Sequence, residues 1–404
     1  MRFTFHATMC QTDHYIPQAK AGEELGYHGF TFPDSICYPQ IADTKYPYNE
    51  DGSRNFLEGT PFLEPFSAIP WLAAVTERIR FTTSVVKLPI RNPVLVAKQA
   101  ATIACLSHNR FALGVGISPW IEDFQICGER WESRGPRMDE MIAIIRGLMT
   151  GEYYGHDTPN YQIPASKICP VPDKPVPILL GGHADVALKR AARIGDGWIH
   201  AGGSYDTLKP LIEKLHNFRK EFGTDHKPFE IHAITADAFN VDGVKRLEEI
   251  GVTECIVGFR NTYAGEVDDK SIEQKIGILR WFADKKGSNL ISREQWRQTL
   301  VSIGLSTFMY KLELSQQELT RLEYLLDEDI KGDISLLEWS KYLHSFGLKA
   351  EHDPNNPFVQ DTLKNLDFNK MLEITKDTEK DDKKKKTQHL LTYEEFLKYC
   401  HKHF

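Results

Sequence analysis

Short strand-like segments alternate with helix-like segments from Met1 to about Gly287, and this alternation limits the fold more than any other feature. Most of the strand-like segments are rich in Val, Ile, Phe or Thr. Each is followed by a stretch in which apolar residues recur with some helical spacing. The eight predicted strands are Arg2–Ala7, His28–Pro33, Ile79–Val85, Arg110–Gly116, Val176–Gly181, Asp196–His200, Phe229–Ile234 and Glu254–Phe259.

Eight successive βα units in about 287 residues fit a closed (β/α)8 TIM barrel better than an open sheet. The segment opened by Pro93 illustrates the helical spacing, since Val94, Ala97 and Ala101 fall on one apolar stripe. A doubly wound sheet is the alternative architecture, but no GxGxxG motif follows the first strand. We therefore predict an α/β barrel over residues 1–287.

Composition argues against several other classes of protein. The chain has 404 residues, a formal net charge of −7 and seven cysteines. It therefore lacks the basic excess of a nucleic-acid-binding or anionic-membrane-binding protein. No apolar run approaches the roughly 18 residues of a membrane span. The cysteines form no CxxC pair and no signal peptide precedes the first strand, so we expect reduced thiols and a cytoplasmic protein.

The βα pattern stops near Gly287, and a second, smaller domain is predicted after it. Residues 288–404 are helical in pattern, with almost no strand signal. The segment 376–388 consists nearly entirely of Lys, Asp, Glu and Thr. Such a segment buries little apolar surface, so we predict a disordered loop there.

Several motifs at the ends of the predicted strands follow one another in a characteristic order. They are Pro33-Asp34-Ser35, Phe81-Thr82-Thr83-Ser84-Val85, Arg91-Asn92-Pro93, Leu113-Gly114-Val115-Gly116 and Pro177-Ile178-Leu179-Leu180-Gly181-Gly182. This order, over nearly all of residues 1–285, resembles the bacterial luciferase-like flavin and deazaflavin oxidoreductases. The closest similarity is to the branch that uses coenzyme F-420, such as the deazaflavin-dependent glucose-6-phosphate dehydrogenases.

Two glycine pairs suggest a phosphate site on physical grounds alone. Gly181-Gly182 lie where a strand leads into a helix, so a phosphate can approach backbone N–H groups and the positive end of the helix dipole. Gly202-Gly203 offer a second turn of this kind after the next strand. The alternative is that both pairs only form tight turns.

The resemblance implies further cofactor-binding residues. In the family, the position of Ser84-Val85 carries a non-proline cis peptide that bulges against the cofactor ring. The resemblance also implies that Asp34 contacts the ring system or its ribityl hydroxyls, and it places Ile117 and Ser118 at the cofactor. An ordinary strand end at Ser84-Val85 and a turn cap at Asp34 are the alternatives.

The chain departs from the glucose-6-phosphate branch at two positions. That branch has a His where this chain has Ser35, and an acid where it has Ser118-Pro119. Glu122 and Asp123 lie just downstream and are candidate substitutes. Among side chains that titrate near pH 7, His6, His183 and His200 lie at or just after the ends of predicted strands. A structural role is the alternative for each. Our catalytic candidates are Asp34, Ser35 and His6.

The resemblance implies an oxidoreductase that transfers a hydride between coenzyme F-420, a deazaflavin, and an unidentified small organic substrate. An FMN-dependent monooxygenase is the alternative within the family. We expect a small-molecule substrate and neither a nucleic-acid nor a membrane partner. A homodimer, and a protein partner for the C-terminal domain, are left open.

The C-terminal domain contains a stretch that resembles an EF-hand loop. Its candidate calcium ligands are Asp327 at position 1, Asp329 at position 3, Ser335 at position 9 and Glu338 at position 12. Lys331 stands at position 5, where an oxygen ligand is expected. Calcium binding and a structural EF-hand relic therefore both remain open.

Two further hypotheses come from outside enzymology. One is a calcium-responsive interaction protein whose barrel has lost its chemistry, which the missing acid and base favour. The other is that two unrelated coding segments have been joined near Gly287. The intact glycine turns, Asp34 and the Ser84-Val85 pair favour the enzyme.

Overall fold

The computed structural model describes residues 1–284, apart from residues 8, 47–51, 240, 259 and 261–266. The chain divides into a unit that ends at Ile276 and another that begins at Gly277. The predicted boundary at residue 287, the loop at 376–388 and the whole EF-hand-like stretch lie outside the described residues and stay predictions. The features described below belong to the first unit, except that the last helix crosses the division.

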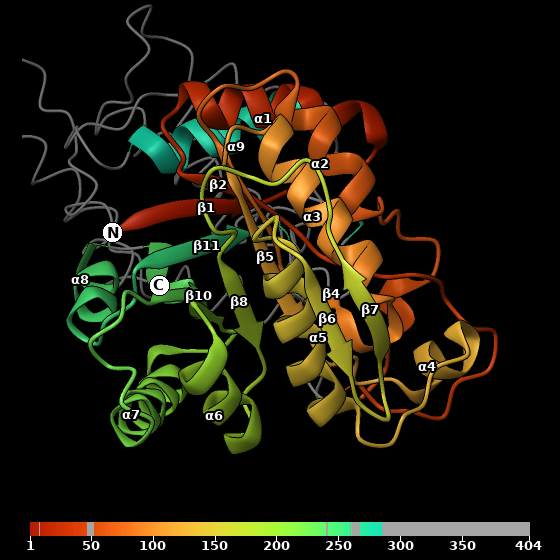
Figure 1. Cartoon of the computed structure of the whole chain (residues 1–404). Helices are drawn as coiled ribbons and strands as arrows, with labels where there is room; N and C mark the ends of the chain where they lie inside the picture. The colour runs from red at the N-terminus through yellow and green to blue at the C-terminus, as the bar shows by residue number, and fades with distance from the viewer. Residues whose placement is uncertain (8, 47–51, 240, 259, 261–266, 285–404) are drawn as a thin grey trace, which may run out of the picture. The chain divides into compact units, whose positions relative to one another are not determined.

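Eight parallel strands close into a barrel, as the sequence predicts (Figure 1). The sheet runs from β3 through β2, β1, β11, β10, β9 and β8 to β5, and the pairing of β3 with β5 closes it. A short strand, β4, resumes the path of β3 and pairs with β5. The strands are β1 (Arg2–His6), β2 (Gly29–Phe32), β3 (Arg80–Thr83), β4 (Val86–Lys87), β5 (Phe111–Gly116), β8 (Ile178–Gly181), β9 (Gly197–Ile199), β10 (Glu230–Ile234) and β11 (Glu254–Gly258).

Helices follow the strands in chain order and lie outside them (Figure 1). Helix α3 shows why the sequence folds this way locally. Pro93 is its first residue, and the Asn92 side chain accepts hydrogen bonds from the backbone of Val94 (2.9 Å) and Leu95 (3.3 Å). The helices are α1 (Tyr15–Glu24), α2 (Pro65–Ala73), α3 (Pro93–Leu106), α4 (Ile121–Cys127), α5 (Arg134–Leu148), α6 (Asp185–Ile194), α7 (Tyr205–Glu221), α8 (Val241–Glu249) and α9 (Ile272–Asp284), with 3-10 turns at Thr12–His14, Asn55–Leu57, Leu88–Ile90 and Ala236–Phe239.

A β-hairpin interrupts the alternation between α5 and β8. Its strands are β6 (Tyr154–Asp157) and β7 (Gln162–Ser166), which pair antiparallel. The Tyr154 ring lies against Gly147 of α5, where a β-carbon would approach it to 2.1 Å. This glycine therefore lets the hairpin dock on the helix.

Small and branched side chains fill the inside of the barrel. Ala112, Leu179, Ile199 and Ile256 form a buried cluster, and Val85 packs against it from the carboxyl ends of the strands. None of the described helices is long and apolar enough to cross a bilayer.

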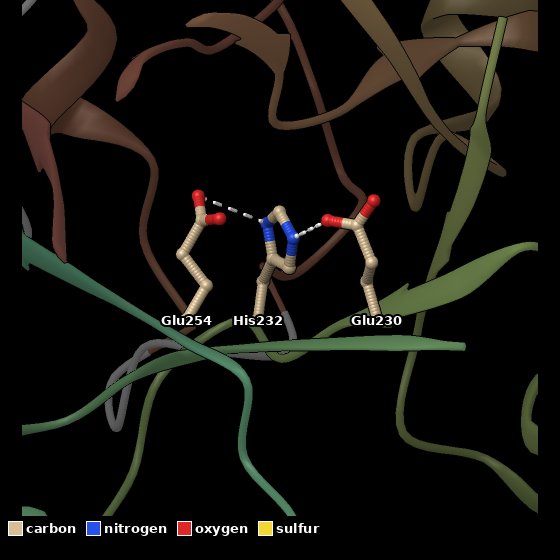
Figure 2. A group of neighbouring side chains, drawn as sticks. All are labelled: Glu230, His232 and Glu254. Carbon is tan, nitrogen blue, oxygen red and sulfur yellow. Dashed lines mark hydrogen bonds and ion pairs between the residues drawn. The ribbon is translucent and has the colours of Figure 1, made fainter. Parts of the chain in front are cut away.

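The amino-terminal end of the barrel contains a partly buried set of charged groups that sequence reasoning missed. Figure 2 shows His232 between two glutamates, with Glu230 on one side and Glu254 on the other. The His232 Nε2 atom lies 2.8 Å from Glu230, and its Nδ1 atom lies 3.6 Å from Glu254. Arg80 makes two hydrogen bonds to Glu230, of 2.7 and 2.9 Å. With Arg2, these five residues form what we call the basal charge network.

The histidine and two glutamates of the basal charge network are side chains of the kind that bind metal ions. The two arginines, however, already balance the charges of the glutamates. The two carboxylates face Arg80 and Arg2, whose Nε lies 3.3 Å from Glu254. Burial alone would raise the pKa of Glu230, but hydrogen bonds from His232 and Arg80 outweigh burial and hold it well below its usual range. A divalent cation would therefore meet carboxylates already bound to arginine, and we assign the cluster a structural role.

Candidate functional site

A ledge of backbone and one apolar side chain stands at the carboxyl end of the barrel. The peptide bond between Ser84 and Val85 is cis, as the resemblance predicts. A β-carbon at Gly116 would lie 2.7 Å from the Val85 side chain, and one at Gly181 would lie 3.2 Å from it. Two glycines on neighbouring strands therefore leave the room that Val85 occupies. We call Ser84, Val85, Gly116 and Gly181 the ledge.

Asp34 holds the segment that carries the ledge. Its carboxylate is buried and accepts hydrogen bonds from the backbone N–H of Lys87 (2.9 Å) and from Arg91 (2.8 Å). Both partners follow Val85 in the chain, so Asp34 ties the end of β2 to β4. Ser35, the next residue, is half-buried.

His6 lies at the end of β1 and contacts the Thr31 hydroxyl through Nδ1 at 3.0 Å. Burial, with a smaller contribution from Arg260, lowers the pKa of His6 to about 4. At neutral pH the ring is therefore uncharged and suited to accept a proton or a hydrogen bond.

The two glycine turns have the backbone conformations that favour glycine. Gly182 has a φ of 114°, and Gly202 and Gly203 have φ values of 120° and 150°. The first turn of α6 has no side-chain cap, whereas Asp237 already accepts a hydrogen bond of 2.8 Å from Tyr205 at the start of α7. The start of α6, after Gly181-Gly182, therefore has more backbone N–H groups available to an anion than the start of α7, after Gly202-Gly203.

Three rings connect these turns. His183 stacks on His200 with ring centres 4.6 Å apart, and Trp198 lies 5.6 Å from His200. Trp198 donates a hydrogen bond to the Gly182 carbonyl, and the His183 ring accepts one from the Ala201 backbone. Burial, together with the neighbouring His183, lowers the pKa of His200 to about 4, and burial lowers the pKa of His183. The sequence indicates His183 and His200 as two separate candidates, whereas in the structure their neutral rings stack on each other.

Beyond β5, Ile117 is half-buried and Ser118 is buried. Ser118 donates a hydrogen bond to Asp123, one of the two acids that are candidate substitutes in the sequence. The Asp123 carboxylate also lies 2.8 Å from the Lys87 ammonium. Sequence reasoning missed Lys87, because one lysine in a Val-Val-Lys-Leu run carries no functional signal.

Comparisons with known proteins agree with this architecture. A family model described as luciferase-like monooxygenase matches residues 6–238. The chain belongs to the luciferase-like monooxygenase family. An uncharacterised protein of Mycobacterium tuberculosis (strain ATCC 25618 / H37Rv) is 51% identical over 284 residues, which cover 70% of this chain and 98% of that protein.

More distant relatives of this luciferase-like protein include enzymes that use a deazaflavin. The F420-dependent glucose-6-phosphate dehydrogenase of Amycolatopsis mediterranei (strain U-32) is 32% identical over 211 residues, or 49% of this chain and 58% of that enzyme. The solved structure of the coenzyme F420-dependent tetrahydromethanopterin reductase from Methanopyrus kandleri superposes with a TM-score of 0.52 at 14% identity, covering 65% of this chain and 95% of that one. At this identity the superposition supports the fold alone.

Proposed function

We propose that the barrel is an oxidoreductase that transfers a hydride between coenzyme F-420 and a small organic substrate. The observation that carries this proposal is the ledge, where two facing glycines leave room for the Val85 side chain at the barrel mouth. A flat ring system packs well against such an apolar bulge. The deazaflavin-using relative at 32% identity favours this cofactor over a flavin.

The glycine turn after β8 suits the phosphate part of such a cofactor. A phosphate near Gly181-Gly182 would face backbone N–H groups and the uncapped start of α6, with Gly202-Gly203 as a second, weaker turn. Ile117 and Ser118 would border the ring. The bound deazaflavin would supply or accept the hydride, and the chain would hold its geometry and exclude water.

The three catalytic candidates then take different roles. Asp34 would act mainly by fixing the ledge, because its carboxylate already binds Arg91 and the Lys87 backbone. His6, neutral at pH 7, would accept a hydrogen bond or a proton near the ring. Ser35, half-buried beside Asp34, would offer a hydroxyl to the ring or to the substrate.

Binding spectra test this proposal directly. The purified full-length protein would be titrated with F-420 and, separately, with FMN, and absorption and fluorescence would report binding. We expect F-420 to bind at roughly micromolar concentration and FMN more weakly. Preferential binding of FMN, with oxygen consumption on reduction, would instead support the monooxygenase named by the family model. If the protein bound neither F-420 nor FMN, the proposed oxidoreductase function would be wrong.

A substitution at the ledge tests where the ring binds. Val85→Ala removes two methyl groups, which corresponds to about 1.5 kcal/mol of apolar contact, or roughly tenfold weaker binding. Val267→Ala removes the same groups from a side chain that is 77% exposed, and it should leave the dissociation constant unchanged. If the two variants bound F-420 equally well, the ledge would not be part of the cofactor site.

A further inference from the structure

Two cations and an indole ring meet beside the ledge. The Lys87 ammonium lies 4.4 Å from the centre of the Trp120 ring, and the Arg54 guanidinium lies 5.2 Å from it. The Lys87 and Arg54 side chains are each 8% exposed, and Trp120 is 5% exposed. They come from β4, from the connection after β2 and from the connection after β5. We call Arg54, Lys87 and Trp120 the donor cluster.

The charges of the donor cluster are balanced by acids. Lys87 pairs with Asp123 at 2.8 Å, and Arg54 pairs with Glu122 at 3.5 Å. Ser118 donates a further hydrogen bond to Asp123 and so fixes the carboxylate that faces Lys87. Because each cation already faces a carboxylate, an added anion would leave a net negative charge in a buried place. The balance favours an uncharged ligand.

The same cluster has hydrogen-bond donors without acceptors. Arg54 Nη2 and Trp120 Nε1 are buried and have no hydrogen-bond partner among the described residues. The Lys87 ammonium has three N–H bonds. Among the described residues, it forms an ion pair with one carboxylate, that of Asp123. A buried donor left without an acceptor is destabilising. Three adjacent side chains with N–H groups to spare therefore point to an oxygen acceptor from outside the chain.

The position of Lys87 connects this acceptor to the ledge. Lys87 stands two residues after Val85 and pairs in register with Gly116, the glycine that Val85 covers. Two residues of chain span at most about 7 Å, so Lys87 cannot lie far from Val85. The donor cluster is thus next to the place where the proposed function puts the reacting ring.

We propose that the donor cluster binds the reacting oxygen of an uncharged carbonyl or alcohol substrate and that Lys87 is the proton donor to that oxygen. This inference rests on the proposed function. During reduction, the carbonyl carbon would take up a hydride, which the bound reduced deazaflavin would supply, and the π pair would move onto oxygen. The oxygen takes a proton from the Lys87 ammonium, which leaves a neutral amine beside Asp123 that regains a proton from water. Alcohol oxidation reverses these steps.

The first test measures binding without turnover. Protein loaded with oxidised F-420 would be titrated with acetone, cyclohexanone and acetophenone, and the deazaflavin absorption band would report occupancy. We expect at least one ketone to shift the band saturably, and pyruvate and benzoylformate, which carry a carboxylate, to bind at least tenfold more weakly. Protein that binds F-420 but responds to none of the ketones at about 100 mM, or that prefers the carboxylates, would overturn the inference and leave the proposed function standing. Failure to bind F-420 would instead contradict the proposed function.

Substitutions at Lys87 separate binding from proton donation. Lys87→Met should weaken ketone binding at least tenfold without changing F-420 affinity, and Lys167→Met, an exposed lysine after β7, should change neither. Lys87→Arg keeps a charged donor but cannot release a proton, so it should retain binding and lower the rate of ketone reduction by about 100-fold or more. A Lys87→Arg protein with the wild-type rate would exclude Lys87 as the proton donor.

Lys87→Met leaves the buried Asp123 carboxylate without its ion-pair partner and could unfold the protein. Two further variants test the inference in that case. Lys87→Met combined with Asp123→Asn removes both charges and should fold while still lacking ketone binding. Trp120→Phe removes only the indole N–H and should weaken ketone binding about fivefold. Unchanged ketone binding in both variants would remove the donor cluster from the substrate site.

Discussion

At the scale of single residues, burial decides which titratable groups can take part in chemistry. The histidines at or just after the ends of β1, β8 and β9 attract attention in the sequence because their usual pKa lies near 7. In the structure, desolvation lowers the pKa values of His6 and His200 to about 4. They are therefore neutral over the physiological range, which suits acceptors and excludes cationic roles.

The neutral state of His200 predicts that acid destabilises the protein. The folded ring resists protonation down to about pH 4, whereas the unfolded ring takes up a proton below about pH 6.5, so stability is full above pH 6.5 and falls as the pH drops towards 4. Between pH 8 and pH 5, this one residue should cost about 2 kcal/mol.

Urea denaturation at both pH values checks the expected loss. His200→Asn cannot titrate and should lose about 2 kcal/mol less than the wild type between pH 8 and pH 5. His226→Asn, at an exposed position, is the matched control and should follow the wild type. Equal acid sensitivity in all three proteins would show that His200 does not contribute.

At the scale of elements, the proposed site lies at the carboxyl ends of the strands and the basal charge network lies at their starts. Asp34 and the ledge lie at the carboxyl ends of the strands, whereas Arg80 and Glu230 stand at the starts of β3 and β10. This division is the one expected of a barrel enzyme, whose loops at the carboxyl ends are free to build a site.

The basal charge network predicts a large loss of stability when one partner is removed. Arg80→Met leaves the half-buried Glu230 without the arginine that donates two hydrogen bonds to it, and the free energy of unfolding should fall by about 3 kcal/mol. Adding Glu230→Gln removes the other charge and should restore part of the loss. Lys167→Met, which breaks the exposed pair with Glu152, should cost less than about 1 kcal/mol. Urea denaturation measures all three, and a loss for Arg80→Met as small as that for Lys167→Met would contradict a structural role.

At the scale of the whole molecule, the chain is longer than the family barrel. The family model ends at residue 238, and the Mycobacterium tuberculosis relative matches 284 residues. The remaining residues include the EF-hand-like stretch, whose calcium site stays a prediction. We expect it to bind calcium weakly, because Lys331 stands where an oxygen ligand belongs.

Calcium binding can be followed through the melting temperature of the full-length protein. A ligand that binds only the folded state raises stability by about 2.7 kcal/mol at 100 times its dissociation constant. We expect calcium to raise the melting temperature, Glu338→Gln to abolish the shift, and Asp333→Asn to preserve it, since position 7 of such a loop uses its backbone carbonyl. A shift that survives Glu338→Gln would disprove the ligand assignment.

The sequence by itself determined the eight strands, the helices that follow them and the two glycine turns. These features are local or periodic, so each can be read within a few neighbouring residues. Only the tertiary structure decided that Lys87 meets Asp123, that Arg54 and Lys87 share Trp120, and that Glu230, His232 and Glu254 gather at the opposite end. Those pairs depend on strand register and on closure of the barrel, because one residue of slip would turn each side chain to the other face of the sheet.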